Sequence, residues 1–387
     1  MTTDFELNYV EVRTVDGRVF REERDPSLSA GAGYDLKRVT WRPADLVMTM
    51  VTKWGEDLEV EVFGNDNQLA RRRGRPVVYL DQNIWIQISK ALNRPELVPQ
   101  SEMAPTLQLV ERARGKELIL PISSAHWIET GSSYGRRRTQ LATQMVALSR
   151  GWIMRNPLLV AASEMESLFR DLPAGNAPQV VSAFTLNHQD LFTEQPLRYV
   201  PRNPNLPPQS LRLIEILSGV NSTLAGLLEK ERTEPEGVAA ASRWASVHQE
   251  FGKLASNRRN SADLREFTLD AFLANLGRGL AEAARNSGLA ASDLQAWRQT
   301  RADSDFALLP YLGMQRELIH LRLMNTADVW EPNDLVDILF LTCAAAYADY
   351  VVCENKTGDY LQRAGRHRPG GAMVMTSVDE LMTALET

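Results

Sequence analysis

Acidic residues stand at several points where the chain changes from an apolar run to a helix-like pattern. The segment "RPVVYLDQNIWIQIS", residues 75–89, is a β-branched run that ends at Asp81, and helical spacing of apolar residues follows at once. Other acids stand at comparable transitions: Glu129, Asp334, Asp337 and Glu354. In an open parallel sheet, side chains that follow the carboxyl ends of the strands meet in one crevice. The spacing therefore predicts a cluster of carboxylates.

Carboxylates held close together repel one another, and each then favours its protonated form. A divalent cation with oxygen ligands removes this conflict, and Mg²⁺ or Mn²⁺ suits a site made of carboxylates better than zinc does. Asp334 and Asp337 are three residues apart, so one helical face presents both. Such ions lower the pKa of a water molecule and balance charge on a phosphodiester. The predicted chemistry is hydrolysis of phosphodiester bonds by a metal-activated water.

Each of these positions except Asp337, which lies deeper in an apolar stretch, also has a purely structural explanation. Asp81 or Asn83 can cap the following helix, because side-chain oxygens there accept backbone N–H groups that lack partners. Glu129 can be an exposed helix residue, and Asp334 in a first helical turn interacts favourably with the helix dipole. Glu354 can be a turn residue paired with a nearby lysine at little energetic consequence. It is less probable that all of these acids occupy such positions by coincidence than that any one of them does.

The elements that must position these acids form a pattern of strands alternating with helices, which predicts a parallel α/β sheet. This pattern occupies residues 76–130, where residues 118–123 are expected to form a short buried strand, and it returns in residues 325–387. Apolar residues three and four apart predict a large all-α insertion over residues 131–324, with one of its helices over residues 209–230. Residues 1–75 carry short alternating runs between turn signals, which predict a small β-rich N-terminal module.

Three segments together resemble a known family. "VVYLDQNIWI", "LPISSAHWIETG" and "NDLVDILFLTCAAAYADYVVCEN" are similar to the successive motifs of the PIN-domain nucleases, metal-dependent ribonucleases with a Rossmann-like fold that include many bacterial toxins. Asp81 matches the acid that ends the first strand of the family, and Asn83 matches the polar residue two places on. Glu129, Asp337 and Glu354 match the second, third and fourth motifs. The fourth is commonly Asp, so Glu354 departs from the family pattern.

The resemblance implies a PIN-like core and an Mg²⁺- or Mn²⁺-dependent endoribonuclease with a role in toxicity, defence or stress. Asp81, Glu129, Asp337 and Glu354 would be metal ligands, and Asp334 would assist. The preference for RNA over DNA comes from the resemblance alone. Two alternatives stay open: a structure-specific DNA nuclease on the same acidic site, and an inactive PIN-like scaffold that binds protein partners.

The net charge of −6 provides no global attraction to nucleic acid. Arginines nevertheless cluster within residues 71–75, 136–138 and 363–368, where they form either a phosphate-binding rim or ordinary solvated surface. The candidate substrate-binding residues are Asn83, Arg136, Arg137, Arg138 and Lys356.

The remaining bulk features predict a cytoplasmic protein. The first residues lack a basic start and an apolar stretch, so no secretory signal is expected. The longest apolar segment, residues 335–353, is interrupted by Asp337 and Asp349, which argues against a membrane span. Asp349 precedes its strand, at the end away from the crevice, and is expected to have a structural role. Cys343 and Cys353 have no metal-ligand residues beside them and are expected to be reduced thiols in the core. Apolar helix faces leave a homodimer possible.

Overall fold

The structure is a computed structural model, and two compact units make up the chain. Unit 1 comprises residues 1–76, 85–153 and 185–231, and unit 2 comprises residues 77–84, 154–184 and 232–387. The residues that the structure describes are 1–13, 16–23, 36–42, 44–62, 72–131, 135–171, 182–191, 216, 219–220, 223–224, 226–227, 235–256, 261–366 and 370–386. The chain is of mixed α/β class.

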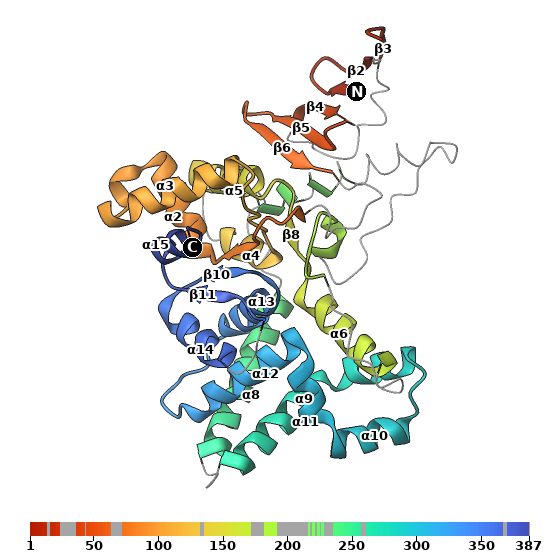
Figure 1. The fold of residues 1–387 in the computed structure, drawn as a ribbon, viewed down its shortest axis with the longest axis vertical. Helices are drawn as coiled ribbons and strands as arrows, with labels where there is room; N and C mark the ends of the chain where they lie inside the picture. The colour runs from red at the N-terminus through yellow and green to blue at the C-terminus, as the bar shows by residue number, and fades with distance from the viewer. Residues whose placement is uncertain are drawn as a thin grey trace. The chain divides into compact units, whose positions relative to one another are not determined.

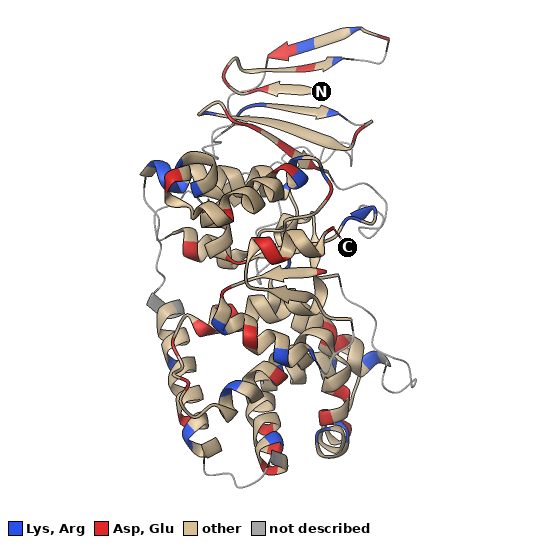
Figure 2. Cartoon of the chain, turned by 60° about the vertical axis from the view of Figure 1, so that its left-hand side comes forward, with Lys and Arg blue, Asp and Glu red and all other residues tan. Residues whose placement is uncertain are grey.

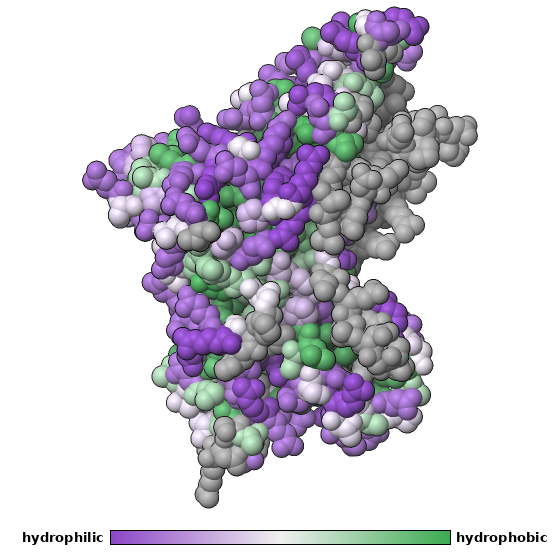
Figure 3. Space-filling view, viewed as in Figure 1, coloured by the Kyte–Doolittle hydropathy of each residue, from purple (hydrophilic) through white to green (hydrophobic). Residues whose placement is uncertain are grey.

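Unit 1 begins with a six-stranded antiparallel sheet, in the order β3-β2-β1-β4-β5-β6 (Figure 1). Its strands are β1 (Thr2–Asp4), β2 (Tyr9–Arg13), β3 (Val19–Glu23), β4 (Leu36–Arg42), β5 (Val47–Thr52) and β6 (Asp57–Glu61). Apolar side chains such as Leu36, Met50 and Leu58 are buried, whereas hydrophilic side chains predominate over the visible face of the sheet in Figure 3. The prediction of a β-rich N-terminal region is therefore confirmed, since the alternating runs do bury one set of side chains.

Buried charges join this sheet to the rest of unit 1. Glu61 accepts two hydrogen bonds from Arg75, at 2.7 and 2.9 Å, and one from the Trp152 indole at 3.2 Å. Arg150 donates to Glu61 at 3.4 Å and to Glu59 at 2.8 Å. Because a buried carboxylate needs several such partners, the last strand of the sheet is held tightly to residues 75 and 150–152.

The helices expected in residues 76–130 are present. They are α2 (Gln82–Asn93), which begins in unit 2 and continues in unit 1, and then α3 (Gln100–Arg114) and α4 (Ser124–Thr130), with the short 3₁₀ helix η2 (Pro95–Leu97) between the first two. The strand expected over residues 118–123 is wrong. Ile119 donates to the carbonyl of Pro76 at 2.9 Å, and Ile122 forms an isolated parallel bridge with Ile153. Pro121 lies between them and has no N–H to donate, so a continuous ladder cannot run through this segment.

Unit 2 contains a three-stranded parallel sheet in the order β11-β10-β7. The strands are β7 (Val78–Leu80), β10 (Tyr350–Val352) and β11 (Met373–Met375). Leu80, Val352 and Met375 stand in register at the carboxyl end of the sheet. The helices α13 (Asp334–Tyr347), α14 (Asn355–Gly365) and α15 (Val378–Ala384) contact these strands or one another. A small parallel sheet was expected from these segments, whereas identity with a PIN-like core remains a proposal.

Helix α12 (Pro310–Met324) is the centre of the helical part of unit 2. It contacts α13 and α14 as well as α6 (Pro157–Asp171), α8 (Pro235–Ser256), α9 (Ser261–Asn286) and α11 (Ala302–Leu308), as Figure 1 also shows. Buried Glu164 accepts the backbone N–H groups of Tyr311 and Leu312, at 2.7 and 2.9 Å, and the Tyr347 hydroxyl. One carboxylate from α6 therefore caps α12 and holds the end of α13.

The predicted insertion, residues 131–324, is mostly helical but not entirely. Besides the helices named above it contains α5 (Gly135–Ser149), α10 (Ala291–Thr300) and the 3₁₀ helix η4 (His188–Leu191). The strands β8 (Ile153–Met154) and β9 (Phe184–Thr185) form a two-stranded sheet within it, which corrects the all-α expectation. The helix expected over residues 209–230 falls largely outside the described residues. Within the part of the chain that is described, no helix combines the length and apolar character needed to cross a membrane.

The cap on α12 yields a test of stability. We expect Glu164→Gln to lower the free energy of unfolding by about 1–3 kcal/mol, because an amide nitrogen would then face a buried donor that needs an acceptor. Urea unfolding followed by circular dichroism measures this loss. Glu166→Gln on the same helix is the control, since Glu166 accepts from Asn286 at the surface and the amide oxygen can still accept. An equal loss in the two variants would contradict the capping role.

Candidate functional site

Asp81 and Glu354 lie at the same edge of the parallel sheet of unit 2. Asp81 follows β7 and Glu354 stands two residues after β10, and the Asp81 N–H donates to the Val352 carbonyl at 2.9 Å. Burial raises the pKa of Asp81, and the negative charge of Glu354 adds to this rise. Hydrogen bonds from the backbone N–H groups of Gln82 and Glu354 oppose it. The edge predicted from the strand ends therefore exists, and the two carboxylates there are electrostatically coupled.

Asp337 belongs to the same group of charges. It lies in the first turn of α13, where it is half-buried. Burial and then the charges of Asp81, Glu354 and Asp334 raise its pKa to about 7, against the opposing effect of Arg322. Burial followed by Asp81, Glu354 and Asp337 also raises the pKa of the Cys353 thiol. We call Asp81, Asp337 and Glu354 the edge carboxylates.

Asp334 has a different environment, although it is only one turn from Asp337. Its Oδ2 accepts from Arg322 Nη2 at 2.9 Å and from the Glu331 N–H at 2.7 Å. Arg322 also donates to Asp328 at 2.7 Å and lies over the Trp330 ring, 4.1 Å from its centroid. Burial alone would lower the pKa of Arg322, but its hydrogen bonds to Asp334 and Asp328 raise it above the usual value. Asp334 is thus the partner of a buried cation, which gives it a structural task.

Lys356 takes part in the same network. Its Nζ lies 3.1 Å from Asp328 Oδ1, so its partner is not Glu354, with which a pairing was considered. The Tyr360 hydroxyl donates to Asp328 at 3.2 Å and accepts from Asn325 at 2.9 Å. The connection between α12 and α13 is therefore fixed by polar contacts at both ends. This network was not expected from the sequence, where the interruption of "LIHLRLM" by Arg322 was the available signal.

Glu129 lies in unit 1, on α4, and is half-buried. Its helix starts with a capping box, in which the Ser123 N–H donates to Nδ1 of His126 at 3.0 Å. The His126 ring is buried and meets Trp85 edge-on, with ring centroids 6.1 Å apart. His126 is therefore a packed residue that orients α4. The role of Glu129 as a ligand in the same site as the edge carboxylates stays a prediction.

The candidate substrate contacts differ in exposure. Asn83 is exposed at the start of α2, and Arg136 and Arg137 are exposed at the start of α5. Arg138 is buried instead, and its Nε donates to the Leu227 carbonyl at 2.6 Å, which ties α5 to a neighbouring segment. Of the three arginines, the first two are therefore accessible from solvent and the third is not. Acidic and basic residues are interspersed along the helices of unit 2, as Figure 2 shows.

Two other sequence expectations concern residues near the sheet. Asp349 lies at the opposite edge, where its Oδ2 accepts the Val77 N–H at 2.6 Å, in keeping with the structural role expected for it. Cys343 and Cys353 are both buried and reduced, which confirms that expectation.

The edge carboxylates fit a hard cation in the chemistry of their donors. All are carboxylate oxygens, and the raised pKa of Asp337 shows that their negative charge is not fully balanced. Among the described residues, however, no three His, Cys, Asp or Glu side chains stand where they could together hold a metal ion. Ligation would therefore require the carboxylates to approach one another, which a cation favours by removing their repulsion.

No family model matches the chain, and no curated protein or solved structure matches it either.

The raised pKa of Asp337 predicts a defined pH dependence of stability. Below pH 3.8, the ordinary pKa, both the folded and the unfolded state hold the proton. As pH rises from there to about 7, the unfolded state loses its proton first, so the folded state becomes less stable and the full penalty is present above about pH 7. At about 1.4 kcal/mol per pKa unit, the penalty amounts to a few kcal/mol.

We therefore expect Asp337→Asn to raise the free energy of unfolding at pH 8 by roughly 1–3 kcal/mol and to have little effect near pH 4. Urea titrations at the two pH values measure the difference. Asp359→Asn is the matched control, because Asp359 is an exposed aspartate of the same unit that pairs with Arg363. A stabilisation of the same size at both pH values would contradict the assignment.

Proposed function

We propose that the chain is a metal-dependent endonuclease with a PIN-like core that hydrolyses phosphodiester bonds, with RNA as the favoured substrate. The observation that carries the proposal is the electrostatic coupling of Asp81, Asp337 and Glu354 around one edge of a parallel sheet. The charges of Asp81 and Glu354 raise the pKa of Asp337, and this repulsion lowers the stability of the fold. Such a cost is typical of functional sites rather than of solvated surfaces.

The order of the motifs also supports this proposal. Asp81 and Glu354 follow neighbouring parallel strands, and Asp337 belongs to the helix that leads into the second of them. In open α/β sheets, ligands bind outside the carboxyl ends of the strands, which is where these side chains stand. The resemblance of the same segments to PIN-domain nucleases names phosphodiester hydrolysis as the reaction and RNA as the substrate.

In this proposal the residues have separate tasks. Asp81, Asp337 and Glu354 would hold the cation, and Glu129 is a further ligand only as the family resemblance implies. Mg²⁺ or Mn²⁺, when bound, supplies positive charge against the phosphodiester and lowers the pKa of water. Asp334 keeps the start of α13 in place through Arg322 and is not required as a ligand. Asn83, Arg136 and Arg137 bind the backbone of the substrate.

Purified protein incubated with single-stranded RNA and DNA, in Mn²⁺, Mg²⁺ or EDTA, tests the function. We expect RNA to be cut with either metal and to stay intact in EDTA. Asp81→Asn, Asp337→Asn and Glu129→Gln should each reduce the rate by roughly a hundredfold or more, the scale seen when one charge-stabilising group is lost. Asp359→Asn should cut at the rate of the unchanged protein.

Other outcomes would assign a different function or a smaller ligand set. Cutting of DNA alone assigns the DNA nuclease alternative, and absence of cutting with every metal assigns the inactive scaffold. If Glu129→Gln cuts normally while Asp81→Asn does not, the ligand set is confined to unit 2.

Metal binding can be tested without activity. We expect millimolar Mn²⁺ at pH 7.5 to raise the midpoint of thermal unfolding of the unchanged protein, because a ligand that binds only the folded state stabilises it. Differential scanning fluorimetry measures the shift, and Ca²⁺ and Mg²⁺ provide the comparison. Asp337→Asn and Asp81→Asn should abolish the shift, whereas Asp359→Asn should retain it. An identical shift in all variants would place the ion elsewhere.

A further inference from the structure

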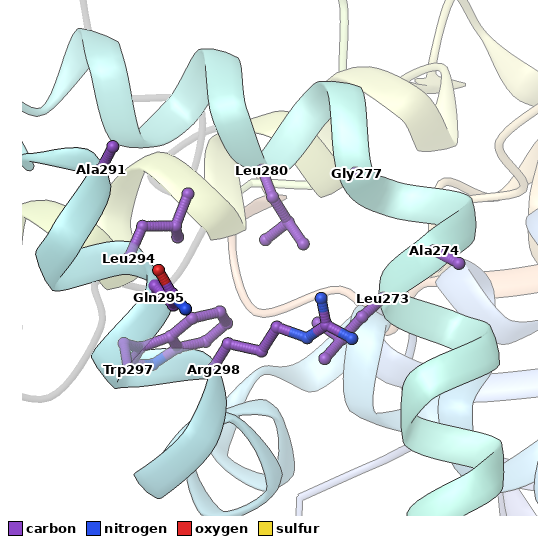
Figure 4. A pocket seen from close by; sticks show the side chains of 9 residues that line it. All are labelled: Leu273, Ala274, Gly277, Leu280, Ala291, Leu294, Gln295, Trp297 and Arg298. Atoms are coloured by element: carbon purple, nitrogen blue, oxygen red, sulfur yellow. The ribbon is translucent and has the colours of Figure 1, made fainter.

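A cavity lies in unit 2, between α9 and α10. It has a volume of about 350 Å³ and opens to solvent on one side. Helix α9 contributes Leu273, Ala274, Gly277 and Leu280, and α10 contributes Ala291, Leu294, Gln295, Trp297 and Arg298, as Figure 4 shows. Small-molecule sites are of about this size and character: cavities of roughly 300 Å³ and upward, mostly apolar, with a few polar groups.

The apolar wall of this cavity is fixed from behind. The Trp297 indole donates to Asp305 Oδ2 at 2.8 Å, and the ring meets Phe169 edge-on with centroids 5.1 Å apart. Phe306 packs against the same ring, 5.7 Å away. Since Trp297 cannot turn without breaking these contacts, the cavity is formed before any ligand arrives, and less conformational freedom is lost on binding.

Gly277 contributes only backbone atoms to the wall of the cavity. A glycine inside a helix destabilises it relative to alanine. Gly279, two residues on, has a packing reason, because a Cβ there would lie 3.0 Å from Met165 Cε. A Cβ on Gly277 would meet nothing within 4 Å, so the space beside this lining residue is open.

The polar lining determines what can bind. Arg298 extends along the cavity below Leu280 (Figure 4), and its side chain is 59% exposed. One of its N–H groups donates to Asp270 at 3.3 Å, in an exposed pair that contributes little energy. A guanidinium has five N–H donors arranged to bind a carboxylate at two points, so Arg298 can hold a second carboxylate. Gln295 adds an amide beside it.

From this combination we propose that the cavity binds a small aliphatic carboxylate, with its chain against the leucines and Trp297 and its carboxylate on Arg298. At about 30 Å³ for each water-sized group, the space accepts roughly a dozen non-hydrogen atoms. Octanoate is of this size and is the probe of choice. The site is separate from the edge carboxylates, and the inference does not depend on the proposed nuclease activity.

Isothermal titration calorimetry of the full chain with octanoate and with octan-1-ol tests the proposal. We expect octanoate to bind roughly tenfold more tightly than the alcohol, which has the same chain but no charge. Arg298→Gln should remove this preference while leaving the affinity for octan-1-ol unchanged. Arg298 is exposed, so this variant tests the site without affecting the core.

A second pair of variants tests the location. Gly277→Trp should fill the cavity and abolish binding of both probes. Gly365→Trp is the matched control, because a Cβ on Gly365 in α14 also meets nothing within 4 Å and lies outside the cavity. Absence of binding by octanoate, equal affinity for the two probes in the unchanged protein, or undiminished binding by Gly277→Trp would each overturn the proposal.

Discussion

The parallel pairing of β7 with β10 is the constraint on which the candidate site depends. These strands are far apart in the sequence, yet Leu80 and Val352 stand in register, so the residues that follow them emerge at one edge. Asp349 secures the opposite end of the same pair by accepting the Val77 N–H. Because side chains alternate between the two faces of a sheet, a slip by one residue would turn Asp81 to the other face. The register therefore determines which acids meet.

Bringing acids together creates a charge that the fold must tolerate, and Arg322 limits it. This buried cation binds Asp328 and Asp334 on the connection between α12 and α13. Its positive charge also opposes the rise in the pKa of Asp337. Its own position follows from α12, whose first turn is capped by Glu164. Buried ion pairs add little net stability, but loss of one partner is costly, so such a network holds a single geometry. The local charge balance thus depends on contacts with distant parts of unit 2.

Local patterns predicted the elements better than their long-range partners. Alternation in residues 47–61 and helical spacing in residues 334–347 each correspond to an observed strand pair or helix. Residues 118–123 are apolar enough for a strand, but Pro121 interrupts the ladder. For the site, the rule for strand ends placed Asp81 and Glu354 correctly. The burial of Arg322 and of Arg138 could not be predicted in this way. The partners of these arginines lie far along the chain or in other elements, and the periodicity of a segment does not encode such contacts.

Asp334 and Asp337 show why helical spacing alone does not assign function. Both lie in the first turn of α13 and share a face, so repulsion would act on both if they met the same surroundings. Arg322 binds Asp334 directly, whereas Asp337 is coupled to the charges of Asp81 and Glu354, and its pKa rises to about 7. A cation at the sheet edge would thus gain most from Asp337 and least from Asp334, whose charge is already balanced. The pair predicted from spacing therefore divides into one acid held in a buried ion pair and one acid whose charge is coupled to Asp81 and Glu354.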